Sequence, residues 1–181
     1  MSFLLSLRHW QAFLLIFVLP FLLQFTLPRI AATTGFSIGE AASTAIDALP
    51  TIFLTVWIWQ VGVLMHRRLP SMINISAIYL HLGALYFVLY TMLLVYTFAL
   101  VRESITEGTL PFGMLVLLLP MHLFATFCFL YMVYFTARSI VSVQHQRIVE
   151  FGEYAAVLLQ IMFLPIGIWF LQSRLRQLPR L

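Results

Sequence analysis

Two histidines lie inside long apolar stretches of this sequence, where an ionisable side chain is costly unless it has a partner or a task. His81 stands near the start of one stretch, and His122 stands near the middle of the next. An imidazole in such a place can ligate haem or a metal ion, or it can relay protons. The plain alternative is two neutral rings that are hydrogen-bonded within a helix bundle. We expect this structural role, and we keep a proton or substrate role for His81 and His122 as the alternative.

The predicted depths of these histidines argue against a ligand shared between them. At about 1.5 Å per residue, His81 lies about 9 Å from the start of its stretch, and His122 lies about 15 Å from the opposite edge. In an apolar layer about 30 Å thick, two antiparallel helices would leave the rings several ångströms apart in height. We therefore predict no cofactor and no metal ligand in this chain.

Glu150 and Glu153 form a second candidate pair, because a spacing of three residues places both side chains on one face of a helix. Paired carboxylates can bind a metal ion or transfer protons. Carboxylates are also favoured in the first turn of a helix, where the backbone dipole is positive. Since an apolar stretch begins at Tyr154, we interpret the pair as the start of a helix and assign no catalytic residue.

The motifs that usually identify an enzyme do not occur in the sequence. HExxH, GxSxG and a glycine-rich phosphate loop are all missing. Cys128 is the single cysteine, so it cannot form a disulfide within the chain, and its apolar surroundings indicate a packing residue. His9, His66 and His145 stand beside arginines at the ends of apolar stretches, where contact with lipid headgroups is expected. The sequence thus favours a protein that is not an enzyme.

The composition is that of a membrane protein. Of the 181 residues, 62% are apolar and 9% are charged, whereas soluble domains have about 45–50% and about 25%. The ten basic residues are all arginine and stand at the ends of apolar stretches, where they favour anionic headgroups rather than nucleic acid. We predict one integral membrane domain over residues 1–181, with the lipid bilayer as its main partner and no nucleic acid.

Apolar stretches of this length predict an all-α, polytopic transmembrane helix bundle, because a spanning helix needs roughly 20 apolar residues. Strands that cross membranes are shorter and alternate in polarity, which these stretches do not. The sequence predicts about five spans, at residues 10–27, 48–65, 75–100, 110–137 and 154–172.

The last stretch leaves the topology open. With five spans and the N-terminus inside, the ten arginines divide five against five, and the positive-inside rule does not choose an orientation. Without the basic tail, the count favours the N-terminus inside. Pro165-Ile-Gly167 interrupts the last stretch and allows an alternative with four spans plus an interfacial or re-entrant segment. In that alternative, the tail remains on the N-terminal side.

Three stretches of the sequence also carry a family resemblance. They are Arg-His-Trp-Gln-Ala-Phe-Leu-Leu at 8–15, Met-His-Arg-Arg-Leu-Pro at 65–70 with Met-Ile-Asn-Ile at 72–75, and Phe-Gly-Glu-Tyr at 151–154 with Phe-Leu-Pro-Ile-Gly-Ile-Trp-Phe-Leu-Gln at 163–172. Together they resemble an uncharacterised family of small multi-pass membrane proteins of Bacteroidetes bacteria, although Ser173 stands where that family has proline and arginine replaces its common lysine. The resemblance implies the bacterial inner membrane and no known chemistry.

Three functions are compatible with these features. The first is a non-catalytic membrane component, such as an accessory or assembly subunit that contacts other membrane proteins. The second is a small transporter or channel-like protein, with a path lined by kinked helices and the buried histidines. The third is a membrane enzyme or haem protein. We favour the first function, because the connections are short and the catalytic motifs are missing.

Overall fold

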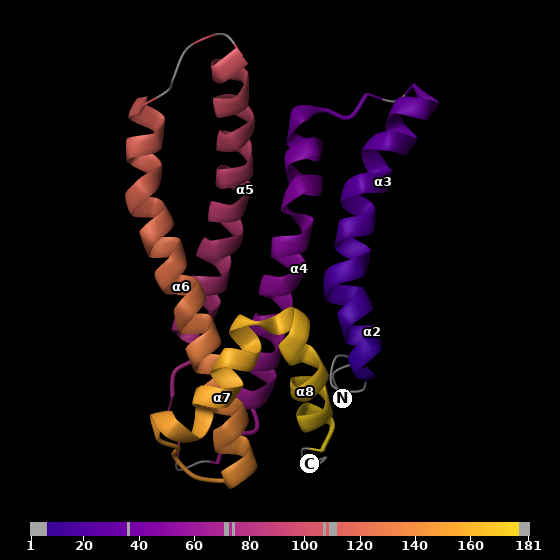
Figure 1. Ribbon diagram of the computed structural model, residues 1–181. Coiled ribbons are helices and arrows are strands. Elements are labelled where there is room, and N and C mark those ends of the chain that lie inside the picture. Colours follow the sequence, from indigo (N-terminus) through magenta and orange to yellow (C-terminus); the bar gives the residue numbers. More distant parts are fainter. Residues whose placement is uncertain are drawn as a thin grey trace.

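The structure is a bundle of helices, and the residues that it describes contain no strand (Figure 1). The computed structural model describes residues 7–35, 37–70, 73, 75–106, 108 and 112–177. The all-α prediction is therefore confirmed. In chain order, the helices are α2 (His9–Phe13), the π-helical turn η1 (Leu14–Val18), α3 (Leu19–Thr34), α4 (Glu40–His66), α5 (Ile78–Thr106), α6 (Phe112–His145), α7 (Phe151–Met162) and α8 (Leu164–Gln177).

Four of the helical segments are long and apolar enough to cross a membrane. The first is His9–Thr34, which α2, η1 and α3 form together, and the others belong to α4, α5 and α6. Segments of 25 to 34 residues would measure about 38–51 Å, which exceeds an apolar layer about 30 Å thick. In a bilayer these helices must therefore tilt or extend beyond the apolar layer.

The first helix continues beyond its predicted end at residue 27. It passes through Pro28 without breaking and ends at Thr34, where Gly35 adopts a left-handed conformation with φ of 71°. Thr34 Oγ1 donates a hydrogen bond to Ile30 O at 2.9 Å and so helps to satisfy the carbonyls of the last turn. Proline removes one backbone donor, but apolar surroundings still favour the helical hydrogen bonds on either side of it.

The second half of α6 is the centre of the packed core. It packs against α4, α5 and α7, and most of its side chains are buried. Thr136 Oγ1 donates to Ile58 O of α4 at 3.3 Å. A Cβ atom at Gly62 would lie 2.7 Å from that hydroxyl, so only glycine allows α4 to approach this closely. The buried apolar side chains of α6 in this region are those of Met132, Val133, Phe135, Ala137, Ile140, Val141 and Val143.

The fifth predicted span, at 154–172, is two short helices instead of one long helix. The chain reverses at Phe163 (φ −102°, ψ 47°), and Phe163 O accepts the backbone N–H groups of Ile166 at 3.0 Å and Gly167 at 2.8 Å. α7 and α8 therefore form a helical hairpin at the end of the bundle where α2 begins (Figure 1). This arrangement corresponds to the alternative with four spans and a re-entrant or interfacial segment.

The two ends of the bundle differ in packing. At the end with the α7–α8 hairpin, hereafter the basal end, α6 lies alongside α4, whereas toward the α5–α6 connection it lies apart from α4 (Figure 1). The first half of α6 accordingly exposes large apolar side chains, including Val116, Leu117, Leu119, Leu123 and Phe127. This distal half of the α5–α6 pair gains little burial within the chain itself.

The close crossing within the α7–α8 hairpin yields a stability prediction. A Cβ atom at Gly167 would overlap the backbone carbonyl of Gln160, whereas a Cβ atom at Gly152 of α7 meets open space. We expect Gly167→Ala to destabilise the protein by about 1–3 kcal/mol through overpacking. Thermal unfolding in detergent measures the effect.

Gly152→Ala is the matched control, because it adds the same methyl group to the same hairpin. It should leave the protein unchanged or stabilise it by up to about 1 kcal/mol through helix propensity. Equal melting temperatures for the two variants would contradict the tight crossing at Gly167.

Candidate functional site

His81 bonds to a tryptophan of the neighbouring helix. Trp59 Nε1 on α4 donates a hydrogen bond to His81 Nδ1 on α5 at 2.8 Å, and the ring centroids lie 5.8 Å apart. Since Nδ1 accepts, the proton of the neutral imidazole is on Nε2. The contact joins α4 and α5 near the basal end.

His122 has a different partner at a different height. Its Nδ1 lies 2.7 Å from the hydroxyl of Tyr90 on α5. Tyr90 is nine residues beyond His81 on that helix, which corresponds to about 14 Å along the axis. The structure therefore does not bring His81 and His122 together. Among the described residues, no group of three histidine, cysteine, aspartate or glutamate side chains is arranged to hold a metal ion.

The side chain of His122 is exposed although its ring is hydrogen-bonded. Within the described part of the chain, its outer nitrogen, Nε2, has no hydrogen-bond partner. The residue is ten positions beyond Phe112 at the start of α6, or about 15 Å along the helix. His122 thus presents one unsatisfied polar atom on a surface that is mainly apolar.

Glu150 and Glu153 lie at the start of α7, as the sequence indicates. Glu150 is the N-cap residue, and its backbone N–H donates to Glu153 Oε2 at 2.9 Å. The Arg147 guanidinium forms an ion pair with the same carboxylate. The backbone N–H of Glu150 and the Arg147 side chain lower the pKa of Glu153 below its ordinary value of 4.5. The capping interpretation accounts for all of these contacts.

The three histidines near the ends of apolar stretches have separate neighbours. His9 packs against Trp169 of α8 with ring centroids 4.6 Å apart. His66 Nε2 donates to Ile75 O at 2.5 Å, while His145 ends α6. The contacts of His9 and His66 both lie at the basal end of the bundle.

A group of tyrosines around Arg138 is a feature that the sequence analysis did not single out. Arg138 Nη1 donates to the hydroxyl of Tyr134 at 2.9 Å. Ring contacts then connect Tyr134 to Tyr154 of α7 (5.8 Å) and, through Tyr131, to Tyr79 of α5 (6.4 Å). We call these five residues the tyrosine–arginine cluster. The spacing of Tyr131, Tyr134 and Arg138, at i, i+3 and i+7, is the signal that could have revealed it.

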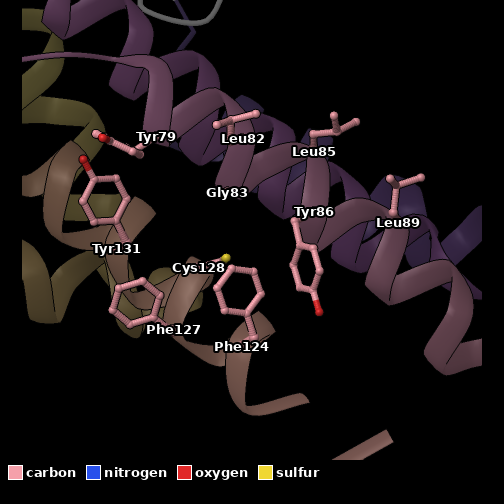
Figure 2. Close-up of a pocket in the computed structure, with 10 residues that line it drawn as sticks. All are labelled: Tyr79, Leu82, Gly83, Leu85, Tyr86, Leu89, Phe124, Phe127, Cys128 and Tyr131. Carbon is pink, nitrogen blue, oxygen red and sulfur yellow. The ribbon is translucent and has the colours of Figure 1, made fainter. Parts of the chain in front are cut away.

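A groove of about 600 Å³ runs between α5 and α6 (Figure 2). Its walls are leucine, phenylalanine and tyrosine side chains, and Gly83 and Cys128 form part of its lining. Tyr79 and Tyr131 stand together at one end, and Tyr86 stands toward the other, where its hydroxyl donates to Met121 O at 3.2 Å. Three smaller surface pockets of about 340, 370 and 510 Å³ are also lined chiefly by apolar side chains. Such pockets suit apolar occupants and do not favour a polar transport path.

Comparison with protein-family models, curated proteins and solved structures gives no match for this chain. Among the described residues, the exposed His122 face of α6 and the groove that leads toward the tyrosine–arginine cluster are both open to a ligand or partner.

The Glu153 contacts predict a dependence of stability on pH. Because folding lowers the pKa of this carboxyl, its contribution is complete above the ordinary value near 4.5 and is lost as the pH falls through the folded value. We expect Glu153→Gln to lower the melting temperature at pH 7 and to have little effect at the acid end of the profile. Melting curves in detergent, from pH 7 down to a pH below the folded pKa of Glu153, test this expectation.

Glu103→Gln is the matched control, because Glu103 is an exposed carboxylate near the distal end of α5. It should leave the melting profile close to that of the parent. A Glu153→Gln protein that melts like the parent at pH 7 would contradict the stabilising role of the Arg147–Glu153 pair.

Proposed function

We propose that this chain is a multi-pass, non-catalytic component of a bacterial inner membrane, and that it acts as an accessory or assembly subunit by binding another membrane protein. The observation that carries the proposal is the exposed His122 on the distal half of α6. The four helices of spanning length support insertion in a bilayer. The resemblance to small membrane proteins of Bacteroidetes supports the inner membrane as its location.

The surface that carries His122 is an extension of the face that packs on α4 in the core. Thr136, which bonds to Ile58 of α4, is fourteen residues beyond His122. Fourteen residues fall only about 40° short of four complete helical turns, so both side chains leave α6 in similar directions. At the height of Thr136 this face packs on α4, whereas at the height of His122 it remains exposed. A second protein can therefore take the place of α4 there.

A partner protein suits this face better than lipid does. The outer imidazole nitrogen lies about 15 Å along α6 from Phe112, with exposed apolar side chains before and after it on the helix, and therefore within the apolar layer. Acyl chains offer it no hydrogen-bond partner, and an unsatisfied polar group in hydrocarbon is costly. A helix that carries a serine, threonine, asparagine or glutamine side chain satisfies it, as interhelical hydrogen bonds do in other membrane bundles.

The partner proposal is tested by purifying the tagged protein from native membranes in mild detergent and identifying the co-purifying protein by mass spectrometry. One interhelical hydrogen bond in a membrane contributes about 0.6–1.7 kcal/mol. We therefore expect His122→Leu to reduce the recovered partner roughly three- to twentyfold. His122→Gln, which retains a polar group at this position, should recover part of the loss.

Tyr90→Phe is the control that separates partner binding from internal packing. It removes the hydroxyl that bonds to Nδ1 of His122 but leaves the outer nitrogen in place. The partner should remain bound to this variant. Equal losses in Tyr90→Phe and His122→Leu, or full recovery in both, would contradict a partner contact at His122.

The distribution of arginines supports an orientation in which the basal end of the bundle, with the whole α7–α8 hairpin, faces the cytoplasm. Seven of the nine described arginines lie in the basal half or at its edge, and only Arg29 and Arg102 lie at the distal end. Arg180 lies outside the described residues. Positively charged flanks face the cytoplasm in most inner-membrane proteins. Five spans would divide the arginines evenly between the two sides of the membrane. With four spans and a basal hairpin, most of the described arginines are on the basal side.

Cysteine labelling tests this orientation and the hairpin together. In a Cys128→Ala background, single cysteines replace Thr33 and Thr106 at the distal end, or His145 and Gln177 at the basal end. We expect a membrane-impermeant maleimide to label the distal pair in intact spheroplasts and the basal pair only after permeabilisation. If Gln177→Cys were labelled with Thr106→Cys, α7 and α8 would cross the membrane, and the proposed topology would be wrong.

A further inference from the structure

The groove between α5 and α6 has the dimensions of an acyl-chain site. On α5 its lining extends from Tyr79 to Leu89, which is ten positions further along and about 15 Å higher on the helix axis. That height is about half of an apolar layer 30 Å thick, or one lipid leaflet. Figure 2 shows side chains of α5 and α6 around the groove, with Tyr79 and Tyr131 at one end, which is the basal end because α5 begins at Ile78.

Arg138 lies beyond that basal end on the same stripe of α6. It is seven residues after Tyr131, and two helical turns return a side chain to within about 20° of the same direction. Tyr131 and Tyr134 bridge the interval, because their rings contact each other at 6.2 Å and Tyr134 accepts a hydrogen bond from Arg138. A molecule that leaves the groove at Tyr131 therefore meets Arg138 and tyrosine hydroxyls next.

The charge of Arg138 has no counter-ion in the described part of the chain. The ion pair described there is the one between Arg147 and Glu153, and the hydrogen-bond partner of Arg138 is the neutral Tyr134. A guanidinium has five N–H donors, and most of them remain available after the bond to Tyr134. A half-buried arginine at the edge of an apolar layer gains most from an anion that two donors can bind together.

We propose that this region binds an anionic phospholipid, with one acyl chain in the α5–α6 groove and the phosphate at Arg138 and the neighbouring tyrosine hydroxyls. A phospholipid matches both halves of the site, since it joins an apolar chain to a phosphate at the interface. The basal location places the headgroup among the other arginines, where a net negative lipid is favoured over a zwitterionic one. The tyrosines suit the interface because their rings are apolar and their hydroxyls are polar.

The lipid site is separate from the proposed partner face. Cys128 in the groove is six residues beyond His122, which places the two side chains about 120° apart around α6. The inference needs insertion in a bilayer but not the partner at His122. A failure of either proposal is therefore distinguishable from a failure of the other.

The headgroup half of the site is tested by native mass spectrometry of the intact protein released from nanodiscs. The discs contain equal amounts of phosphatidylglycerol, which is anionic, and phosphatidylcholine, which is zwitterionic. We expect the parent protein to retain phosphatidylglycerol preferentially, and Arg138→Gln to weaken this preference roughly five- to tenfold. Arg138→Lys should preserve part of it, because it keeps the charge but loses the paired donors.

Arg102→Gln is the matched control, because it removes an exposed arginine from the distal end of α5. It should retain the parent's preference. Equal retention of both lipids by the parent, or an unchanged preference in Arg138→Gln, would overturn the assignment of the phosphate to Arg138.

The acyl-chain half of the site is tested at Gly83 in the groove. A Cβ atom there would lie 3.7 Å from its nearest neighbours on α6, which is an ordinary contact, so Gly83→Ala should fold and bind lipid normally. Gly83→Leu fills the groove and should lose the retained lipid of either headgroup. Melting curves verify that each variant is folded, and a folded Gly83→Leu that retains lipid like the parent would overturn the groove assignment.

Discussion

The reversal of the chain at Phe163 is the constraint on which the rest of the structure depends. A single helix over this region would carry the C-terminal arginines to the opposite end of the bundle. Instead, Phe163 O caps the start of α8, and the glycine at position 167 lets α8 cross α7 at backbone distance. Both ends of the α7–α8 hairpin therefore remain at the basal end, where Gln172 Nε2 donates to Leu7 O at 2.9 Å. The basal end therefore contains most of the described arginines and most of the buried side chains.

Because the packed side chains are concentrated at the basal end, the distal half of the α5–α6 pair has large apolar side chains on its surface. Within the hairpin, α7 packs against the second half of α6, where most side chains from Met132 to Val143 are buried. On the distal side of Ala125, no element of the described chain covers α6 in the same way, and the apolar side chains there remain on the surface. In water such a surface would cause aggregation, whereas in a bilayer it is a surface for lipids and partner helices. The bare distal half thus provides the proposed partner face and part of the α5–α6 groove.

The sequence alone predicts the helical class and the positions of the four long helices, because their apolar length is a local property of the chain. It is less informative about where helices end, since proline acts differently in different surroundings. Pro28, Pro50 and Pro120 lie within continuous helices, whereas the break near Pro165 becomes a reversal. The difference depends on tertiary contacts, above all the crossing of α8 over Gln160. Those contacts join residues on separate helices and leave no simple periodic signal.

The candidate sites show the same division between local and tertiary information. The capping role of Glu150 and Glu153 could be predicted because it depends on neighbours three residues apart. The partners of His81 and His122 depend instead on the register between helices, which pairs one with Trp59 and the other with Tyr90. Arg138 is the strongest case, because the sequence presents it merely as one basic residue after a span. Only the packed structure surrounds it with tyrosines, and among the described residues no carboxylate pairs with it. At a membrane interface, a cation in such surroundings favours an anion from outside the chain.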